Sequence, residues 1–391
     1  MDGSPIGLYI HIPWCVRKCP YCDFNSHPAP MELPADRYAA ALVRDLDEEL
    51  ARAADRTVAS VFFGGGTPSL FPPEVIASIL DAARSRLRVA ADAEVTLEAN
   101  PGTVECGRFA EYLAAGVNRV SLGAQSFSAE SLRSLGRIHS PRDTVRAVEE
   151  LVAAGIENFN LDVMYALPRQ TIAEAILDVS RAIELRPAHL SLYQLTLEPG
   201  TAFFSRPPAL PAEDDAYEMQ DACGGLLAAG GYEQYEVSAY ARPGRQCRHN
   251  LNYWRFGDYI GIGAGAHGKL TQAGGAIRTE RTKSPRAYLT AIEEGRSVAV
   301  TRTVPEQDLA FEFMLNALRL RSGFLESDFV AGTGLDFAIV ADTMTRLTAR
   351  GLLRRTDDRW TATRRGFDFL NELTAEFLPE QSPPASTAFT G

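Results

Sequence analysis

The chain has 391 residues, of which 46% are hydrophobic and 23% are charged, and its formal net charge is -11. This composition predicts a globular protein with one large and one smaller domain, and the negative charge argues against broad, non-specific binding of nucleic acid. No apolar run is long enough to span a bilayer, and the first residues lack the basic start and long apolar core of a secretory signal, so we expect a cytoplasmic protein.

Six short apolar segments alternate with helical patterns in the first half of the chain. The predicted strands are residues 7–12, 58–63, 93–99, 117–123, 159–166 and 189–195. Between them, segments such as 36–53 and 171–185 carry apolar residues at helical spacing. This alternation predicts an α/β fold with parallel strands and helical crossovers, either an open doubly wound sheet or a barrel.

Polar and sharply turning sequences follow the first five predicted strands. In chain order they are PWCVRKCPYC, GGGTPS, NPG, AQSF and LPRQT. In both candidate architectures, ligands bind at the carboxyl ends of the strands. Any one of these segments is explained as a simple turn, but the whole set indicates the walls of a site.

The second half of the chain changes character twice. Residues 205–215 form a proline-rich loop, and 216–300 are mixed. Residues 305–320 and 336–351 have helical patterns, and 352–366 indicate two short strands around an Asp-Asp turn. The predicted domains are a barrel over 1–235, a connecting segment over 236–300, a winged-helix-like domain over 301–378 and a disordered tail over 379–391.

Three of the six cysteines cluster as Cys15, Cys19 and Cys22, with C-x3-C-x2-C spacing. Structural zinc sites and ferredoxin-type clusters use four ligands. Three thiolates can instead hold three corners of a four-iron cluster and leave the fourth iron open. Zinc with a distant fourth ligand and a chance cluster stay as alternatives, while Cys106 and Cys223 fit small buried or idle thiols.

The spacing C-x3-C-x-aromatic-C, with Tyr21 as the aromatic residue, resembles the signature of radical S-adenosylmethionine (radical SAM) proteins. The resemblance implies a partial (β/α)6 barrel and a [4Fe-4S] cluster held by Cys15, Cys19 and Cys22. It also implies that S-adenosylmethionine binds at the open iron. GGGTPS at 64–69 matches the glycine motif of this family, where backbone without side chains lets polar groups approach a ligand closely.

Residues 7–375 resemble the oxygen-independent coproporphyrinogen III oxidase group, through motifs such as LEANPG, SLGAQSF, LGRIHS, NLDVMYALPRQT and DYIGIGAGAHG. By this resemblance a defined set of residues would line the S-adenosylmethionine pocket: Tyr9, Tyr21, Gly65, Gly66, Thr67, Glu98, Gln125, Arg137 and Asp162. Glu98, Gln125 and Asp162 lie at or near strand ends and can hydrogen-bond ribose or amino groups. Arg137 offers a planar fork for a carboxylate.

Two departures from the oxidase pattern favour the haem chaperone branch of this group, the HemW-like proteins. The oxidase pattern continues to a further cysteine, whereas Asp23 and Phe24 follow Cys22, and the first strand begins too early for the N-terminal extension of the oxidases. HemW-like proteins carry an HNxxYW motif, matched here by His249, Asn250, Tyr253 and Trp254. Imidazole is a favoured haem ligand, and aromatic faces suit a porphyrin. The alternative for this motif is a packed loop with a hydrogen-bonded histidine.

Three functions therefore stay open, and whether the chain is an enzyme is undecided. The favoured one is a chaperone that carries haem as cargo to apo-haemoproteins such as respiratory enzymes, with transient membrane association and a homodimer as further expectations. The second is oxidative decarboxylation of coproporphyrinogen III. The third is a nucleic-acid-binding sensor, suggested by seven arginines within 346–365. GAGAHG at 263–268 matches the G-x-G-x-x-G sequence pattern of dinucleotide-binding proteins. No clear βαβ unit follows it, so we do not expect a dinucleotide site there.

Overall fold

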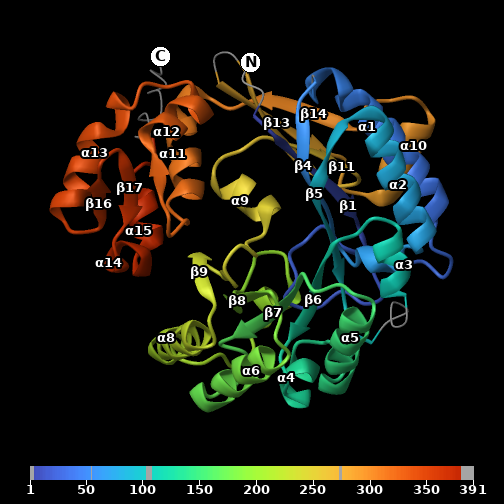
Figure 1. Ribbon diagram of the computed structural model, residues 1–391, viewed down its shortest axis with the longest axis horizontal. Helices are drawn as coiled ribbons and strands as arrows, with labels where there is room; N and C mark the ends of the chain where they lie inside the picture. Colours follow the sequence, from blue (N-terminus) through green and yellow to red (C-terminus); the bar gives the residue numbers. More distant parts are fainter. Residues whose placement is uncertain (1–3, 54, 103–107, 273–274, 380–391) are drawn as a thin grey trace, which may run out of the picture. The chain divides into compact units, whose positions relative to one another are not determined.

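Figure 1 shows the computed structural model, which describes residues 4–53, 55–102, 108–272 and 275–379. The chain divides into two compact units. The barrel unit comprises Met1–Asn252, Gly257–Leu270 and Arg278–Thr301, and the C-terminal unit comprises Tyr253–Phe256, Thr271–Ile277 and Arg302–Gly391. The domain boundaries expected from the sequence stay a prediction. The expected disordered tail lies, from residue 380 onward, outside the described residues.

Six parallel strands form the centre of the sheet in the barrel unit. In spatial order they are β1 (Ile6–Ile12), β4 (Thr57–Gly65), β5 (Arg88–Ala99), β6 (Arg119–Gln125), β7 (Phe159–Tyr165) and β8 (His189–Gln194). All six predicted strands are confirmed. Parallel strands are buried on both faces and read as apolar runs, which is why they can be recognised in the sequence.

Helices cross over between these strands and lie on the outer side of the sheet (Figure 1). The longer ones are α1 (Ala35–Ala53), α2 (Pro73–Arg86), α5 (Pro141–Ala153), α6 (Ile172–Glu184) and α8 (Glu213–Ala229). Capping boxes start α5 at Ser140 and α6 at Thr171, so their first backbone N–H groups are satisfied. The apolar faces of the helices bury residues such as Leu42 and Val148 against the strands, which fixes the strand ends in space.

The segment that follows β8 adds strands to both edges of this sheet. Antiparallel β10 (Ala239–Ala241) and then β9 (Glu233–Glu236) extend the β8 edge. Strand β11 (Tyr259–Ile262) pairs parallel with β1, and β12 (His267–Gln272), β13 (Gly275–Arg281) and β14 (Ala299–Thr303) continue the 12-stranded sheet. The sheet has two edges, β9 and β14, so the barrel is partial, as the family resemblance implied.

The GAGAHG segment is the tight turn between β11 and β12. Gly263 and Gly265 have positive φ angles of 99° and 83°, and the amide of Ala266 donates to the Gly263 carbonyl at 3.0 Å. No helix begins there, since the next element is an antiparallel strand. The dinucleotide reading is therefore wrong, and the glycines are explained by the turn itself.

Helices and a small sheet pack together in the C-terminal unit. The helices are α11 (Glu306–Ala317), α12 (Glu326–Thr333), α13 (Ala338–Ala349), α14 (Arg364–Asp368) and α15 (Leu370–Ala375). Strands β16 (Leu353–Thr356) and β17 (Arg359–Ala362) form the predicted hairpin, and β15 (Phe324–Leu325) joins it as a third strand. Phe313 lies at the centre of the core and contacts the rings of Phe324 and Phe329 edge to face. The expected winged-helix-like arrangement is confirmed, although the sequence did not reveal α12 and β15.

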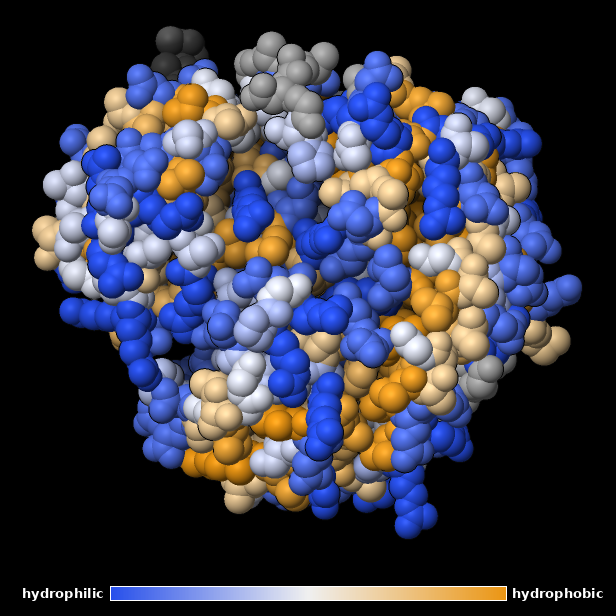
Figure 2. Space-filling view, in the orientation of Figure 1, coloured by the Kyte–Doolittle hydropathy of each residue, from blue (hydrophilic) through white to orange (hydrophobic). Residues whose placement is uncertain are grey.

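Hydrophilic and hydrophobic residues are interspersed on the face of the molecule shown in Figure 2. Among the helices of the described residues, none combines the length and the apolar character that crossing a membrane requires.

One buried ionic cluster ties α1 to β13 in the barrel unit. The Arg281 side chain is fully buried, and it donates to Asp45 at 2.9 Å and to Glu49 at 2.7 Å. Asp45 also accepts from the Tyr288 hydroxyl at 2.8 Å and from the Gly263 amide at 2.9 Å. Because a buried charge without a partner is costly, these contacts depend on one another.

Candidate cofactor site

A cavity of about 320 Å³ opens among the carboxyl ends of the six parallel strands. Its walls come from the cysteine loop after β1, from the end of β4 and from the ends of β5 to β8. Eight of the nine residues expected to bind S-adenosylmethionine line it: Tyr21, Gly65, Gly66, Thr67, Glu98, Gln125, Arg137 and Asp162. Residues of the first four predicted polar segments line this cavity, whereas no residue of the fifth, LPRQT at 167–171, does. The ligand that each residue binds stays a prediction.

The cysteine loop is folded so that its three thiols face this cavity. Strands β2 (Trp14–Cys15) and β3 (His27–Pro28) pair at its base. The Cys22 amide donates to the Cys19 carbonyl at 3.2 Å, which turns the loop between these two residues. Cys15, Cys19 and Cys22 are free thiols of intermediate exposure, and all three line the cavity.

The surroundings of the thiols fit a bound iron-sulfur cluster. Burial raises the pKa of Cys15 and of Cys22, and the other cysteines of the loop raise both pKa values further. A raised pKa means that ionising these thiols is costly. Bound iron would offset this cost, because metal binding displaces the thiol protons. Among the described residues no three His, Cys, Asp or Glu side chains are grouped as ligands of a single metal ion. The thiolates of a four-iron cluster bind different irons, so they lie further apart than the ligands of one ion.

The glycine segment GGGTPS packs directly beneath the cysteine loop. A Cβ at Gly66 would lie 2.5 Å from the carbonyl oxygen of Trp14, and Gly65 has φ = 115°. The Gly66 amide donates to the Ile12 carbonyl at 2.8 Å, and the Thr67 amide donates to the Trp14 carbonyl at 2.7 Å. These glycines thus have a packing role in holding the loop, in addition to any contact with a ligand.

Two carboxyl groups line the cavity, those of Glu98 and Asp162. Glu98 accepts from the Gly65 amide at 3.1 Å, and Asp162 accepts from Asn160 at 2.8 Å and from Ser121 at 3.3 Å. Burial, and then the charge of Asp162, raise the pKa of Glu98 to about 8. Burial also raises the pKa of Asp162. Because desolvation penalises their charged form, hydrogen-bond donors of a ligand would favour ionisation of both carboxyls.

The raised pKa of Glu98 predicts a pH-dependent stability of the ligand-free protein. A carboxyl with pKa 4.5 when unfolded and about 8 when folded binds more protons in the folded state between these values, so stability falls as pH rises through this window. We expect Glu98→Gln, which keeps an acceptor for the Gly65 amide, to remove part of this fall. Denaturant unfolding at pH 5 and pH 8 checks this prediction. Relative to wild type, the unfolding free energy of the variant should be higher at pH 8 than at pH 5. The same difference between variant and wild type at both pH values would contradict it.

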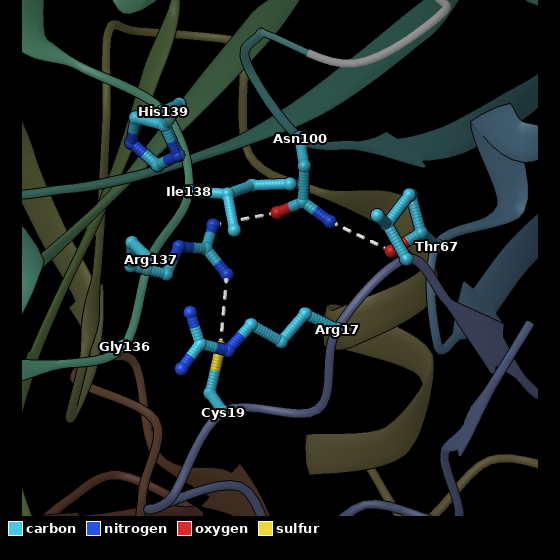
Figure 3. Close-up of a pocket in the computed structure, with 9 residues that line it drawn as sticks. Arg17, Cys19, Thr67, Asn100, Gly136, Arg137, Ile138 and His139 are labelled. Atoms are coloured by element: carbon cyan, nitrogen blue, oxygen red, sulfur yellow. Dashed lines mark hydrogen bonds between the residues drawn. The ribbon is translucent and has the colours of Figure 1, made fainter.

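Arg137 is a partly buried clamp on the cysteine loop. Its Nη2 donates to Asn100 Oδ1 at 2.5 Å and to the Gly123 carbonyl at 2.6 Å, and its Nη1 lies 3.7 Å from Cys19 Sγ (Figure 3). Asn100 in turn donates to Thr67 Oγ1 at 2.8 Å. Part of the guanidinium fork that the sequence assigned to a carboxylate is therefore already occupied by protein groups. Asn100 was missed as a site residue, although it follows β5 in the LEANPG segment.

Tyr9 and Gln125 depart from a simple ligand-contact role. Tyr9 does not line the cavity; its hydroxyl lies 3.0 Å from His11 Nδ1, and its ring stacks 6.2 Å from Phe62. Gln125 ends β6 with φ = 64°, and its Oε1 accepts from the Tyr193 hydroxyl at 2.7 Å. Tyr193 also lines the cavity and was not anticipated, because a tyrosine in a strand is more often a core residue.

The HNxxYW residues do not line this cavity. They lie on helix α9 (Arg248–Trp254), which the boundary between the two units crosses. His249 is only 4% exposed; its Nδ1 lies 3.1 Å from Ser60 Oγ, and its ring stacks 4.8 Å from Phe62. Burial, and then the charge of Arg119, lower the pKa of His249 to about 3. This placement matches the packed alternative for the motif, and haem ligation by His249 would require it to leave this packing.

Trp254 of the motif, and Cys247 two residues before His249, each have a packing partner of their own. In the C-terminal unit the Arg319 guanidinium lies 4.2 Å from the centre of the Trp254 ring. In the barrel unit Cys247 is fully buried and its thiol is 3.4 Å from Glu94 Oε1; burial raises its pKa to about 12, so it is a poor metal ligand. Haem contact by His249, Asn250, Tyr253 and Trp254 stays a prediction.

Comparison with known proteins places this site in a family. Residues 9–180 match the radical SAM superfamily, and residues 304–369 match the HemN C-terminal domain. The heme chaperone HemW of Escherichia coli is 51% identical over 96% of this chain and 99% of its own length, and that of Haemophilus influenzae is 46% identical over the same shares. Coproporphyrinogen III oxidase (HemN) of E. coli shares the fold, with a TM-score of 0.81 at 22% identity over 95% of this chain and 90% of its own. The chain therefore belongs to the HemW family of the radical SAM superfamily.

Proposed function

We propose that this protein is a haem chaperone that binds haem and transfers it to apo-haemoproteins. The observation that carries the proposal is the 51% identity to a protein named heme chaperone HemW, over 99% of that protein's length. The site agrees with it, because Asp23 and the exposed Phe24 stand at the cavity where the oxidase pattern continues to a further cysteine. Phe24 can neither ligate a metal nor transfer a proton.

The same cavity would hold a [4Fe-4S] cluster and S-adenosylmethionine. Cys15, Cys19 and Cys22 would ligate three irons, and the cavity beside them would receive the nucleoside. When bound, the cluster supplies an open iron for the methionine amino and carboxylate groups and an electron for the sulfonium. The chain's own contribution is to fix the loop through Arg137 and Thr67, and to present the acceptors of Glu98, Gln125 and Asp162 to ribose or amino groups.

Neither alternative function has an observation of its own in the structure. The likeness to HemN at 22% identity shows the fold alone. Of the seven arginines at 346–365, four form ion pairs with acids of the C-terminal unit, which reduces the charge offered to phosphates: Arg346, Arg350, Arg355 and Arg364. A cytoplasmic location, respiratory enzymes as acceptors, transient membrane association and a homodimer remain predictions.

One anaerobic experiment separates the chaperone from the oxidase. Reconstituted protein with S-adenosylmethionine and a reductant would be given haem in one arm and coproporphyrinogen III in another. We expect stable haem absorbance that passes to an apo-haemoprotein, and no protoporphyrinogen beyond the level of a Cys19→Ala control. Turnover of coproporphyrinogen, or failure to take up haem, would overturn the proposal.

A further inference from the structure

The proposed function requires a haem-binding site on this protein. His249, the residue expected to bind haem, is buried and packed on Phe62 and Ser60. A cargo that is collected and handed over needs a binding surface reachable from solvent. Exposed apolar side chains beside a cation would provide such a surface for haem.

Three exposed apolar side chains line the cofactor cavity or a smaller cavity that shares part of its wall. Val16 is 49% exposed, Phe24 is 59% exposed and Ile138 is 51% exposed. Phe24 lines the large cavity, whereas Val16 and Ile138 line a smaller adjoining one. The two cavities share Cys19 and Arg137 in their walls, so they adjoin each other. Exposed apolar side chains beside adjoining cavities offer contact to an apolar ligand.

Arg17 supplies a positive charge beside the same cavities. It lines both cavities, as Cys19 does, and both side chains are drawn in Figure 3. It is exposed and makes no hydrogen bond or ion pair with any other described residue. The neighbouring Lys18 is engaged: its Nζ donates to the carbonyls of Phe24 at 3.0 Å and Ser26 at 3.2 Å, which holds Phe24 in place.

We propose that Val16, Arg17, Phe24 and Ile138, which we call the cysteine-loop rim, form the haem-binding surface of this protein. Haem combines a flat apolar macrocycle with two propionates on one edge. Phe24, Val16 and Ile138 offer apolar contact to the macrocycle, and Arg17 pairs with a propionate. Asp23 and Glu198 also line the large cavity, so the anionic edge of haem turns toward Arg17. This inference rests on the proposed function, since it locates the cargo of the chaperone.

Haem titration of the full-length reconstituted protein, followed by absorbance, tests the rim. We expect Phe24→Ser and Ile138→Ser each to raise the haem Kd by about tenfold, as for loss of one well-buried apolar contact. Leu177→Ser on α6 is the matched control, because Leu177 is 57% exposed and lies outside the cavity. Ile138 lies outside the cysteine loop, so unchanged iron and sulfide in Ile138→Ser show that the cluster is intact.

The contact between Arg17 and a propionate is tested by comparing the binding of haem with that of haem dimethyl ester. Wild-type protein should bind haem more tightly than haem dimethyl ester, whose propionates carry no charge. Arg17→Gln should bind the two alike, whereas Arg142→Gln, a control at an exposed arginine on α5, should keep the preference. A residue that only supported the fold would weaken both ligands equally.

The outcomes separate this inference from the function on which it rests. If wild-type protein takes up no haem, the proposed chaperone function is wrong, and the haem-binding role of the rim is rejected with it. If wild type binds haem and the rim variants bind it equally well while His249→Ala does not, the function stands and the rim is overturned. If the rim variants keep haem but lose reduction of the cluster by a protein electron donor, the rim is a protein-docking surface and the proposal is wrong.

Discussion

Replacing Cys19 with alanine is expected to abolish the iron-sulfur absorbance of the reconstituted protein and leave a folded chain. Cys19 is one of three thiols facing one cavity, and with two thiolates left the cluster would have two irons without a protein ligand. The substitution lies in a loop of intermediate exposure and removes only a thiol. Arg137 keeps its bonds to Asn100 and Gly123, which hold the loop opposite. Iron and sulfide content after anaerobic reconstitution is the measurement, with circular dichroism to show the fold.

Cys223→Ala is the matched control for this experiment. Cys223 is fully buried in α8, and burial raises its pKa to about 12, so it is an inert core thiol. We expect this variant to keep full iron and sulfide content, with at most a small loss of stability from the lost packing. Equal cluster content in Cys19→Ala and wild type would contradict the three-thiolate site, and zinc in place of iron would point to the alternative metal.

The cysteine and glycine segments could be predicted because their information is local. The spacing of Cys15, Cys19 and Cys22 is set by a short loop, and the glycines after β4 are required by a close backbone approach to Trp14. The six parallel strands were equally visible, since burial on both faces makes them apolar runs. Their carboxyl ends meet in any parallel α/β fold, which is why Glu98, Gln125 and Asp162 could be expected in one cavity.

What the sequence did not reveal depends on contacts between distant segments. Nothing near Arg137 indicates that Asn100 and Gly123 would occupy part of its fork. The burial of His249 follows from α9 packing on Ser60, 189 residues earlier in the chain. Likewise β11 is a short apolar segment whose pairing with β1 adds a strand that no local pattern predicts.

Arg281→Met should be strongly destabilising, by about 3–5 kcal/mol of unfolding free energy, because it removes the buried cation that pairs with both Asp45 and Glu49. Glu49 keeps its ion pair with Arg52 at 2.6 Å, whereas the Asp45 carboxylate is left with neutral hydrogen-bond donors. Arg281 and Asp45 are fully buried, and Glu49 is nearly so. Burial already raises the pKa of Asp45, opposed by Arg281, so without the arginine the carboxyl is more readily neutralised. The loss should therefore be smaller at pH 5 than at pH 8, since protonation relieves the unpaired charge.

Arg37→Met provides the contrast within the same part of the barrel unit. The Arg37–Glu293 pair joins α1 to α10 (Pro285–Glu293) at 2.5 Å, but its side chains are 53% and 45% exposed. Water and salt screen such a pair, so its removal should leave the unfolding free energy nearly unchanged. Guanidinium unfolding of both variants at the two pH values compares them directly. Similar midpoints for Arg281→Met and Arg37→Met would mean that the buried cluster contributes no more than a surface pair, and that the packing of α1 on β13 is held by its apolar contacts instead.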